Sequence, residues 1–169
     1  MEAGSPVRIE PFAPRHAPAV QRLVADPLIT ATTLIPHPYP EDGAERFIAE
    51  SVKAWAEGTA FNFAVLVGGA VVGSCGLKEL HDGQADLGYW IGVPFWGHGY
   101  ATEAARRVAA FGFERLGLAR ITAHALARNP ASARVLEKAG FRLVGSERNP
   151  FARWDPDDVI LRYVLERNT

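Results

Sequence analysis

A turn that contains two glycines, Gly97 and Gly99, is the feature that most restricts how this chain can fold. It follows the apolar and aromatic run 87–93, which is typical of a strand, and precedes residues 104–116, where apolar side chains recur at helical spacing. The segment is therefore predicted to be a strand, a glycine turn and a helix. Glycine has no Cβ, so a ligand can approach the main chain closely at this turn. The first N–H groups of the helix lack intrahelical acceptors, so the segment is suited to bind a phosphate or a diphosphate.

Two other nucleotide-binding loops are excluded by the sequence. It contains no Gly-x-x-x-x-Gly-Lys-Ser/Thr segment, and no Gly-x-Gly-x-x-Gly segment followed by a suitably spaced acidic residue. On this turn alone, a tight connection that binds no ligand remains the alternative.

Length and composition favour one globular domain that spans residues 1–169. Hydrophobic residues make up 48% of the chain and charged residues 22%, as in soluble proteins. The formal net charge of -1 argues against a nucleic-acid binder. Basic residues nevertheless outnumber acidic ones in the segment 94–148, which suits a ligand that carries several phosphates.

The single cysteine, Cys75, excludes an internal disulfide and favours a reducing compartment, so we expect a cytoplasmic protein. Met1 to Pro6 show no basic region followed by an apolar one, so no signal peptide is expected. No apolar run reaches the length that spans a membrane, and we expect no membrane partner.

The rest of the chain predicts a mixed α/β sheet with helices on both faces. The Gly68-Gly69 pair between two apolar runs predicts a hairpin, and residues 81–83 predict a second turn. The long irregular segment 28–40 is expected to help form the wall of a substrate pocket. Strands are expected at 7–10, 61–67, 70–77, 87–93, 119–126, 141–145 and 159–165, and helices at 16–25, 41–57, 104–116 and 129–139.

Two blocks of this sequence resemble one known family. Residues 85–104 closely resemble the acetyl-CoA site of the GNAT N-acetyltransferases, in the branch of the ribosomal-protein N-terminal acetyltransferases (RimJ/RimL-like). Residues 120–123, followed by 129–141, resemble the second block of that site, in the same order and at the same separation. The pair of blocks is far more specific than the glycine turn alone.

The resemblance implies an α/β (α+β) fold with a central, mixed and mostly antiparallel sheet of about six to seven strands. The sheet would be splayed between its fourth and fifth strands, with helices on both faces. The implied activity is transfer of the acetyl group from acetyl-CoA to a primary amine by direct attack in a ternary complex. The acceptor would be a protein N-terminus or a small-molecule amine, and the chain a monomer or a homodimer.

The cofactor-binding residues are carried over from the matching motifs. The pantetheine arm would pair with the strand end at Ile91, Gly92 and Val93, which we expect to peel away from residues 121–123 because Pro94 cannot continue a ladder. Asn129 would bind pantetheine or cap the helix that follows, and Arg134 or Arg128 would contact a phosphate. The diphosphate would lie on Gly97, His98, Gly99, Tyr100, Ala101 and Thr102.

The sequence departs from the family pattern at two of these positions. Trp96 occupies the place of a Gln or Arg, and His98 replaces a residue that is often basic. A neutral His98 gives the diphosphate less positive charge than Lys would, so these changes put the affinity in question more than the identity of the ligand.

Two residues are predicted to be catalytic. Many GNAT enzymes protonate the leaving thiol with a Tyr, but residues 129–134 contain none, and Ser132 matches the RimJ/RimL-like pattern as the group that holds the sulfur. Asp86 matches an acidic position at the start of the fourth strand and is the first choice for the general base. Glu79, His81 or a chain of waters are the alternatives.

No metal site is expected, because the sequence shows no cluster of His and Cys. His124, which alternates within a predicted strand, is interpreted as a packed or rim residue. A second function from a different class stays open: a CoA-binding sensor or interaction module without catalysis would need the same glycine turn and would also lack the Tyr.

Overall fold

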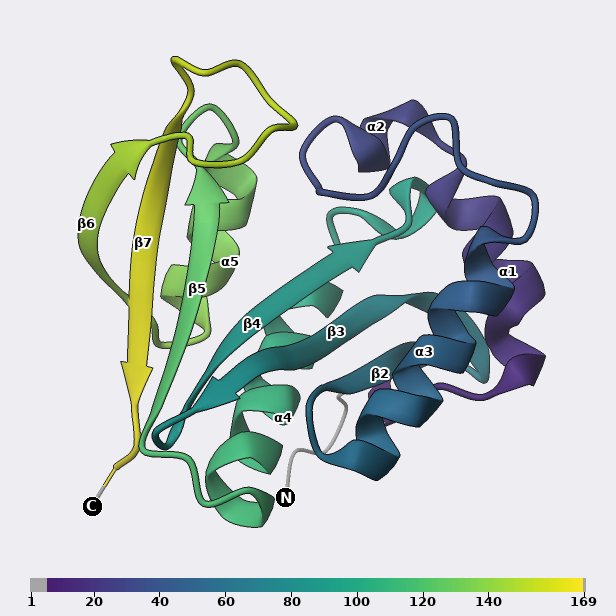
Figure 1. Ribbon diagram of the computed structural model, residues 1–169, viewed down its shortest axis with the longest axis horizontal. Helices are drawn as coiled ribbons and strands as arrows, with labels where there is room; N and C mark the ends of the chain where they lie inside the picture. Colours follow the sequence, from purple (N-terminus) through teal and green to yellow (C-terminus); the bar gives the residue numbers. More distant parts are fainter. Residues whose placement is uncertain (1–5, 169) are drawn as a thin grey trace.

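The computed structural model describes residues 6–168, which form a seven-stranded mixed sheet in the order β1-β2-β3-β4-β5-β7-β6 (Figure 1). All pairings are antiparallel except that between β4 and β5. The strands are β1 Val7–Pro11, β2 Phe61–Val67, β3 Ala70–His81, β4 Gln84–Ile91, β5 Arg120–Leu126, β6 Arg142–Arg148 and β7 Val159–Glu166. The fold class and the strand number expected from the resemblance are therefore confirmed.

Helices cover both faces of the sheet, as predicted. On one face α4 packs against β3, β4 and β5, and α5 lies under β5. Leu77 of β3, Leu118 of the α4–β5 loop and Ile121 of β5 surround Gly112 of α4. On the other face α1 and α3 close a second apolar core. The helices are α1 Ala17–Val24, α2 Pro27–Thr30, α3 Gly43–Glu57, α4 Tyr100–Arg115 and α5 Pro130–Lys138, with short 3-10 turns η1 Pro14–His16 and η2 Val93–Phe95.

The sheet opens between β4 and β5. These strands pair only from Gln84 to Asp86, opposite Arg120 to Thr122, whereas β4 stays paired with β3 as far as Ile91. Beyond Thr122, β5 pairs only with β7. The sequence analysis predicted this opening but placed its cause at Pro94. That position is wrong, because the two strands part after Asp86 and Thr122, where each continues along its own neighbouring strand.

Several boundaries differ from the sequence expectations. Residues 28–40 are not wholly irregular, because Asp26 caps the short helix α2 by accepting a hydrogen bond from the Leu28 N–H. The helix after the glycine turn begins at Tyr100 rather than Ala104, since the helical hydrogen bonds start as soon as Gly99 has turned the chain. Strand β6 continues to Arg148, into the segment expected to be a linker.

Within residues 6–168, no helix is both long and apolar enough to cross a membrane. The interpretation that the N-terminus carries no signal peptide concerns Met1 to Pro6, and all of these except Pro6 lie outside the described residues.

Candidate active site

A cavity of about 530 Å³ lies along the glycine turn, where the sequence predicts the diphosphate. It is lined by the glycine turn, the first helical turn of α4, one face of α5 and residues of the segment 28–33. Gly97 and Gly99 have φ angles of +83° and +78°, and a Cβ at either position would meet only open space. Gly99 is also the N-cap of α4 and has no side chain to cap it, so the first N–H groups of the helix remain available to an anion. These features fit the phosphates of CoA.

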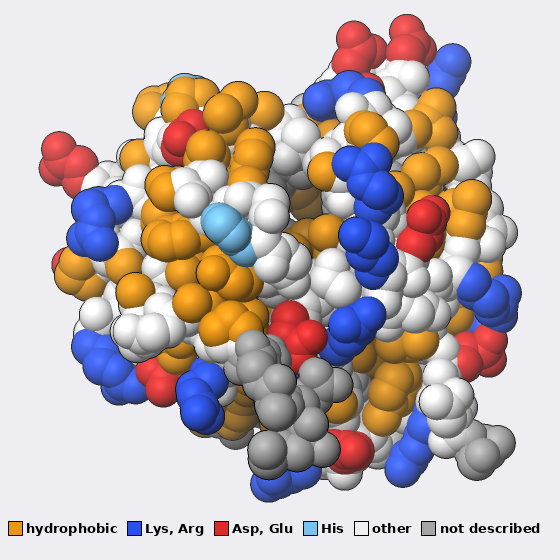
Figure 2. Space-filling model, turned by 180° about the vertical axis from the view of Figure 1, so that it is seen from behind, with side chains coloured by type: hydrophobic (Ala, Val, Ile, Leu, Met, Phe, Trp, Pro, Cys, Tyr) orange, Lys and Arg blue, Asp and Glu red, His pale blue; other side chains and the backbone are white. Residues whose placement is uncertain are grey.

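Positive side chains border the same cavity. Arg134 and Lys138 of α5 line it, and Arg134 makes no ion pair within residues 6–168. Arg128, the alternative phosphate contact, instead pairs with Asp158, with 2.9 Å between Nε and Oδ1. Figure 2 shows Lys and Arg side chains gathered beside a hollow on this side of the molecule. Of the two arginines, Arg134 is therefore placed to contact a phosphate.

The predicted diphosphate residues are not all equally placed. Gly97, Gly99, Tyr100, Ala101 and Thr102 line the cavity, whereas His98 does not and instead stacks on the Tyr100 ring, with 5.2 Å between centroids. Gly92 and Val93 also lie outside the lining.

The open edge of β4 is partly occupied by the protein itself. Gly92 donates its N–H to Val72 O, so the main-chain groups of Ile91 point to the other side, toward the opening. The Ile91 carbonyl accepts a hydrogen bond of 2.6 Å from Trp96 Nε1. The Val93 carbonyl accepts a hydrogen bond of 3.2 Å from the Trp96 N–H. The expectation that the peeled strand end leaves the main-chain groups of Ile91 and Val93 unpaired is therefore wrong for both carbonyls. Trp96, noted in the sequence only as a departure, holds the turn against the end of the strand.

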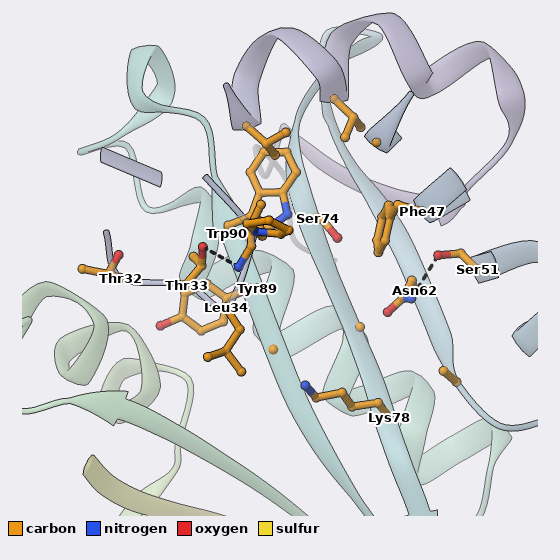
Figure 3. Close-up of a pocket in the computed structure, with 18 of the residues that line it drawn as sticks. Thr32, Thr33, Leu34, Phe47, Ser51, Asn62, Ser74, Lys78, Tyr89 and Trp90 are labelled. Atoms are coloured by element: carbon orange, nitrogen blue, oxygen red, sulfur yellow. Dashed lines mark hydrogen bonds between the residues drawn. The ribbon is translucent and has the colours of Figure 1, made fainter. Parts of the chain in front are cut away.

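A second cavity of about 690 Å³ lies on the opposite face of the sheet (Figure 3). Cross-strand neighbours share a face, and this floor carries small side chains or none: Ser74, Gly76 and Gly88. Phe47 of α3, Trp90 of β4 and Trp154 of the β6–β7 loop line it as well, and Figure 3 shows Phe47 and Trp90 around the space. The sheet is left open here for a ligand of moderate size.

Segments far apart in the sequence close this second cavity. Arg153 in the β6–β7 loop donates a hydrogen bond of 2.8 Å to the Thr30 carbonyl at the end of α2. Figure 1 shows this loop reaching toward the α2 segment above the opening of the sheet. The segment 28–40, predicted to be a pocket wall, is thus one of two walls, and the other comes from the β6–β7 loop.

Tyr89 and Ser132 stand where the two cavities meet, since both residues line both. The Tyr89 hydroxyl lies 2.6 Å from Ser132 Oγ and also donates to the Ser132 carbonyl at 3.2 Å. Burial raises the pKa of Tyr89 to about 12, against the opposing effect of the Ser132 hydrogen bond, so the phenol stays protonated at neutral pH. Sequence reasoning missed Tyr89 because it looked for a tyrosine only near Ser132 in the chain, and the strand alternation alone could not show that its hydroxyl reaches α5.

Asn129 also lines both cavities, at the N-cap of α5. Its side chain makes no capping hydrogen bond. Of the two roles expected from the sequence, helix capping is therefore not observed, and the side-chain amide remains available for a ligand.

Asp86 is buried at the last paired position between β4 and β5, with 9% of its surface exposed. Thr122 Oγ1 donates a hydrogen bond of 2.8 Å to Asp86 Oδ1, and His124 Nδ1 lies 3.9 Å from Asp86 Oδ2. Burial raises the pKa of Asp86, and the Thr122 hydrogen bond opposes that shift. None of the three candidate bases Asp86, Glu79 and His81 lines either cavity. The His81 ring is held by the Glu79 carbonyl at 2.9 Å.

Among the described residues, no group of three or more His, Cys, Asp or Glu side chains could hold a metal ion.

Comparisons with known proteins agree with this geometry. Residues 7–142 match the Acetyltransferase (GNAT) domain. The chain is 34% identical over 97 residues to the uncharacterised N-acetyltransferase p20 of Bacillus licheniformis, covering 55% of this chain and 54% of that protein. The match thus spans only about half the length of that relative. The chain is also 25% identical over 173 residues to the FsC-acetyl coenzyme A-N(2)-transacetylase of Aspergillus fumigatus, covering 95% of this chain and 74% of that protein.

Among solved structures, the chain superposes on RimL, a ribosomal L7/L12 α-N-protein acetyltransferase in complex with CoA, with a TM-score of 0.86. That pair is 16% identical and covers 96% of this chain and 95% of the other, so the likeness shows the fold. With a domain match over most of its length and a sheet that opens beside an uncapped glycine turn, this chain belongs to the GNAT acetyltransferase family.

Proposed function

We propose that the chain transfers the acetyl group of acetyl-CoA to a primary amine. The observation that carries the proposal is the meeting of two cavities at the Tyr89–Ser132 pair, one beside an anion-binding turn and one on the opposite face of the sheet. A thioester held between them would be open to an amine from one side while its phosphates remain on the other. The names of relatives support this: one is an acetyl coenzyme A-N(2)-transacetylase, and RimL acetylates a ribosomal protein.

Acetyl-CoA supplies an activated acetyl group and a good leaving group. The residues that would hold it are the N–H groups of the turn and of the first turn of α4, together with Arg134 for a phosphate and Asn129 for the pantetheine arm. Ile91 keeps an N–H that points toward the opening, and we assign it to the pantetheine amides, together with the Val93 N–H just outside the cavity lining. Gly92 would hold this segment in place, since it donates its N–H to Val72 O and accepts a hydrogen bond from the Phe95 N–H. His98 would support the turn through its stacking on Tyr100.

Ser132 and Tyr89 would stabilise the sulfur as the bond to the acetyl group breaks. A phenol with a pKa of about 12 cannot protonate a thiolate outright, since an ordinary thiol has a pKa of roughly 8.5. Its role is to fix the Ser132 hydroxyl and to share its hydrogen bond with the negative charge that develops. Asp86, buried beside the opening, is one of the residues that would take part in removing the proton of the amine.

The acceptor class includes protein N-termini and small-molecule amines. RimL acts on a protein, whereas a neighbour with a TM-score of 0.83 and 18% identity is a spermidine N-acetyltransferase of Vibrio cholerae in complex with CoA and spermine. We further propose that the chain works as a single domain, as a monomer or homodimer, in the cytoplasm, where its lone thiol Cys75 would stay reduced.

The experiment is calorimetric titration with acetyl-CoA, followed by a thiol-release assay with a panel of amines that includes spermidine and N-terminal peptides. Tight binding together with turnover on at least one amine supports the proposal. Binding without turnover on any amine would support the non-catalytic CoA-binding module instead. Absence of binding would overturn both functions.

A further inference from the structure

We propose that His124, positioned by Asp86, is the group that accepts the proton of the attacking amine. The inference deepens the proposed function, on which it rests, by assigning the general base of the same site. It also replaces the interpretation of His124 as a packing residue, and it gives Asp86 a positioning role in place of direct contact with the amine.

The position of His124 in the sheet is the first argument. It lies on β5 just beyond Thr122, the last residue that pairs with β4. It therefore lies where the opening between the strands begins. Together with Gly88 it lines the second cavity, which we call the acceptor cavity because the proposed amine would enter there; the cavity along the glycine turn is called the CoA cavity. A Cβ on Gly88 would meet nothing within 4 Å, so the floor of the cavity is open at this position of β4.

The second argument is the environment of the two ring nitrogens. Nδ1 is buried and has no hydrogen-bond partner among the described residues, and the nearest carboxylate oxygen, Asp86 Oδ2, is 3.9 Å away. Asp86 is itself fixed by the Thr122 hydroxyl through its other oxygen. A carboxylate beside Nδ1 favours the tautomer with the proton on that nitrogen. Nε2 then carries the free lone pair and is the proton acceptor. Unlike Nδ1, it is not a buried nitrogen that lacks a hydrogen-bond partner.

The third argument is the division of the site by the sheet. Asp86 is paired with Thr122, so alternation along the two strands places Gly88 and His124 on the face of the acceptor cavity. Tyr89 points to the opposite face, where it meets Ser132 of α5. The proposed proton acceptor thus lies on the face of the acceptor cavity, whereas the groups proposed to stabilise the sulfur lie where the two cavities meet.

The charges around His124 keep it ready to accept a proton. Burial lowers the pKa of His124, and the Asp86 carboxylate opposes that shift. Arg162 on β7 and Lys78 on β3 lower the pKa further, whereas Glu79 on β3 raises it. The Phe151 ring of the β6–β7 loop packs against the imidazole, with 5.2 Å between centroids. The imidazole is therefore neutral at pH 7, and its basic form is lost only as the pH falls.

The reaction step balances on these groups. The amine nitrogen uses its lone pair to form the C–N bond to the acetyl carbon, and the C–S bond breaks with its electron pair on sulfur. One proton leaves the nitrogen for His124 Nε2 and then passes to water. The thiolate, held by Ser132, takes one proton from water, so the products are the N-acetyl amine and CoA.

The test compares His124→Gln with His81→Gln, a change of the other candidate histidine at the end of β3, and with Asp86→Asn. The measurements are kcat/KM against pH with the best amine, calorimetric titration with acetyl-CoA, and the His124 pKa by NMR of the imidazole nitrogens. In the wild type, kcat/KM should rise with pH through the pKa of His124. His124→Gln should lower kcat/KM by roughly 10²-fold or more and remove this acid limb, while acetyl-CoA binding changes by less than about 3-fold.

Asp86→Asn should move the acid limb and the His124 pKa measured by NMR to lower pH, because an anion that favours the protonated ring has been removed. A purely structural role of Asp86 would leave the limb where it is, and that result would overturn its assignment. A His124→Gln enzyme with near wild-type kcat/KM and an unchanged acid limb would overturn the assignment of the base, as would a comparable loss in His81→Gln. A wild-type protein that binds acetyl-CoA and acetylates no amine overturns the proposed function itself.

Discussion

The two sides of the opening between β4 and β5 are built in different ways. On the side where we propose that CoA binds, one continuous segment from Ile91 to Thr102 offers main-chain groups, and two glycines at positive φ turn it. On the acceptor side, the cavity is made of side chains from α3, β3, β4, β5, residues 32–36 and the β6–β7 loop. We expect the first arrangement to recognise a constant ligand with the backbone, whereas the second can change its specificity by substituting side chains while the fold is kept.

The largest effect should come from placing a charge on the backbone side. Gly99→Glu puts a carboxylate at the helix N-terminus, where the diphosphate should lie, and strains a residue with φ +78°. We expect the Kd for acetyl-CoA to rise by about 100-fold or more, which corresponds to roughly 2.7 kcal/mol. Calorimetric titration with acetyl-CoA measures this change in Kd.

Two controls separate charge from strain. Gly99→Ala carries the strain without the charge, and Gly117→Glu adds a charge at φ +68° with open space around it, in the loop that joins α4 to β5. Both should keep most of the affinity. Equal weakening by all three variants would show that local binding by the turn is not the cause.

A smaller effect is expected at the junction of the two sides. Ser132→Ala removes the hydroxyl that we propose holds the sulfur, and we expect kcat to fall roughly 10- to 100-fold with little change in the Kd for acetyl-CoA. Tyr89→Phe should lower kcat less, because Ser132 keeps its hydroxyl and loses only its partner at 2.6 Å. Stopped-flow single turnovers would isolate this step. If Tyr89→Phe cost more than Ser132→Ala, the phenol itself would be the group nearer to the sulfur.

On the acceptor side, filling the cavity should affect only the amine. Gly88→Leu projects a side chain into the open space above the floor, so we expect the KM for the amine to rise about 10-fold. The Kd for acetyl-CoA should change by less than about 3-fold, because Gly88 does not line the CoA cavity. Gly145→Leu on the exposed strand β6, also surrounded by open space, is the control that should leave both constants unchanged. Parallel losses in both constants for Gly88→Leu would argue against two separate cavities.

The smallest effect is expected from the contact between the two walls. Arg153→Ala removes the hydrogen bond to the Thr30 carbonyl, so the β6–β7 loop should be held less firmly over the cavity. The KM for the amine should rise by about 3-fold with kcat nearly unchanged, since one hydrogen bond contributes on the order of 1 kcal/mol. Arg148→Ala, which removes an exposed ion pair with Asp157, should have no effect on steady-state kinetics. A fall in kcat for Arg153→Ala would indicate that the loop also orders the reacting groups.

The sequence by itself determined the parts of this protein that depend on neighbours in the chain. Strand alternation, the hairpin at Gly68-Gly69 and the glycine turn before α4 are local patterns, and the structure confirms each of them. Ser132 and Asn129 were found because a motif of adjacent residues contains them, and both line the cavities. Such features are set by backbone geometry within a few residues, so the order of residue types is enough to predict them.

Only the tertiary structure decided which distant side chains meet. Tyr89 reaches Ser132 across 43 positions of sequence, and Arg153 reaches Thr30 across 123. The contacts of Asp86 with Thr122 and His124, and of Trp96 with the Ile91 carbonyl, likewise depend on where β4 leaves β5 and how the turn folds back. Strand pairing and helix packing set these distances, and the sequence around any one of the residues contains no record of them.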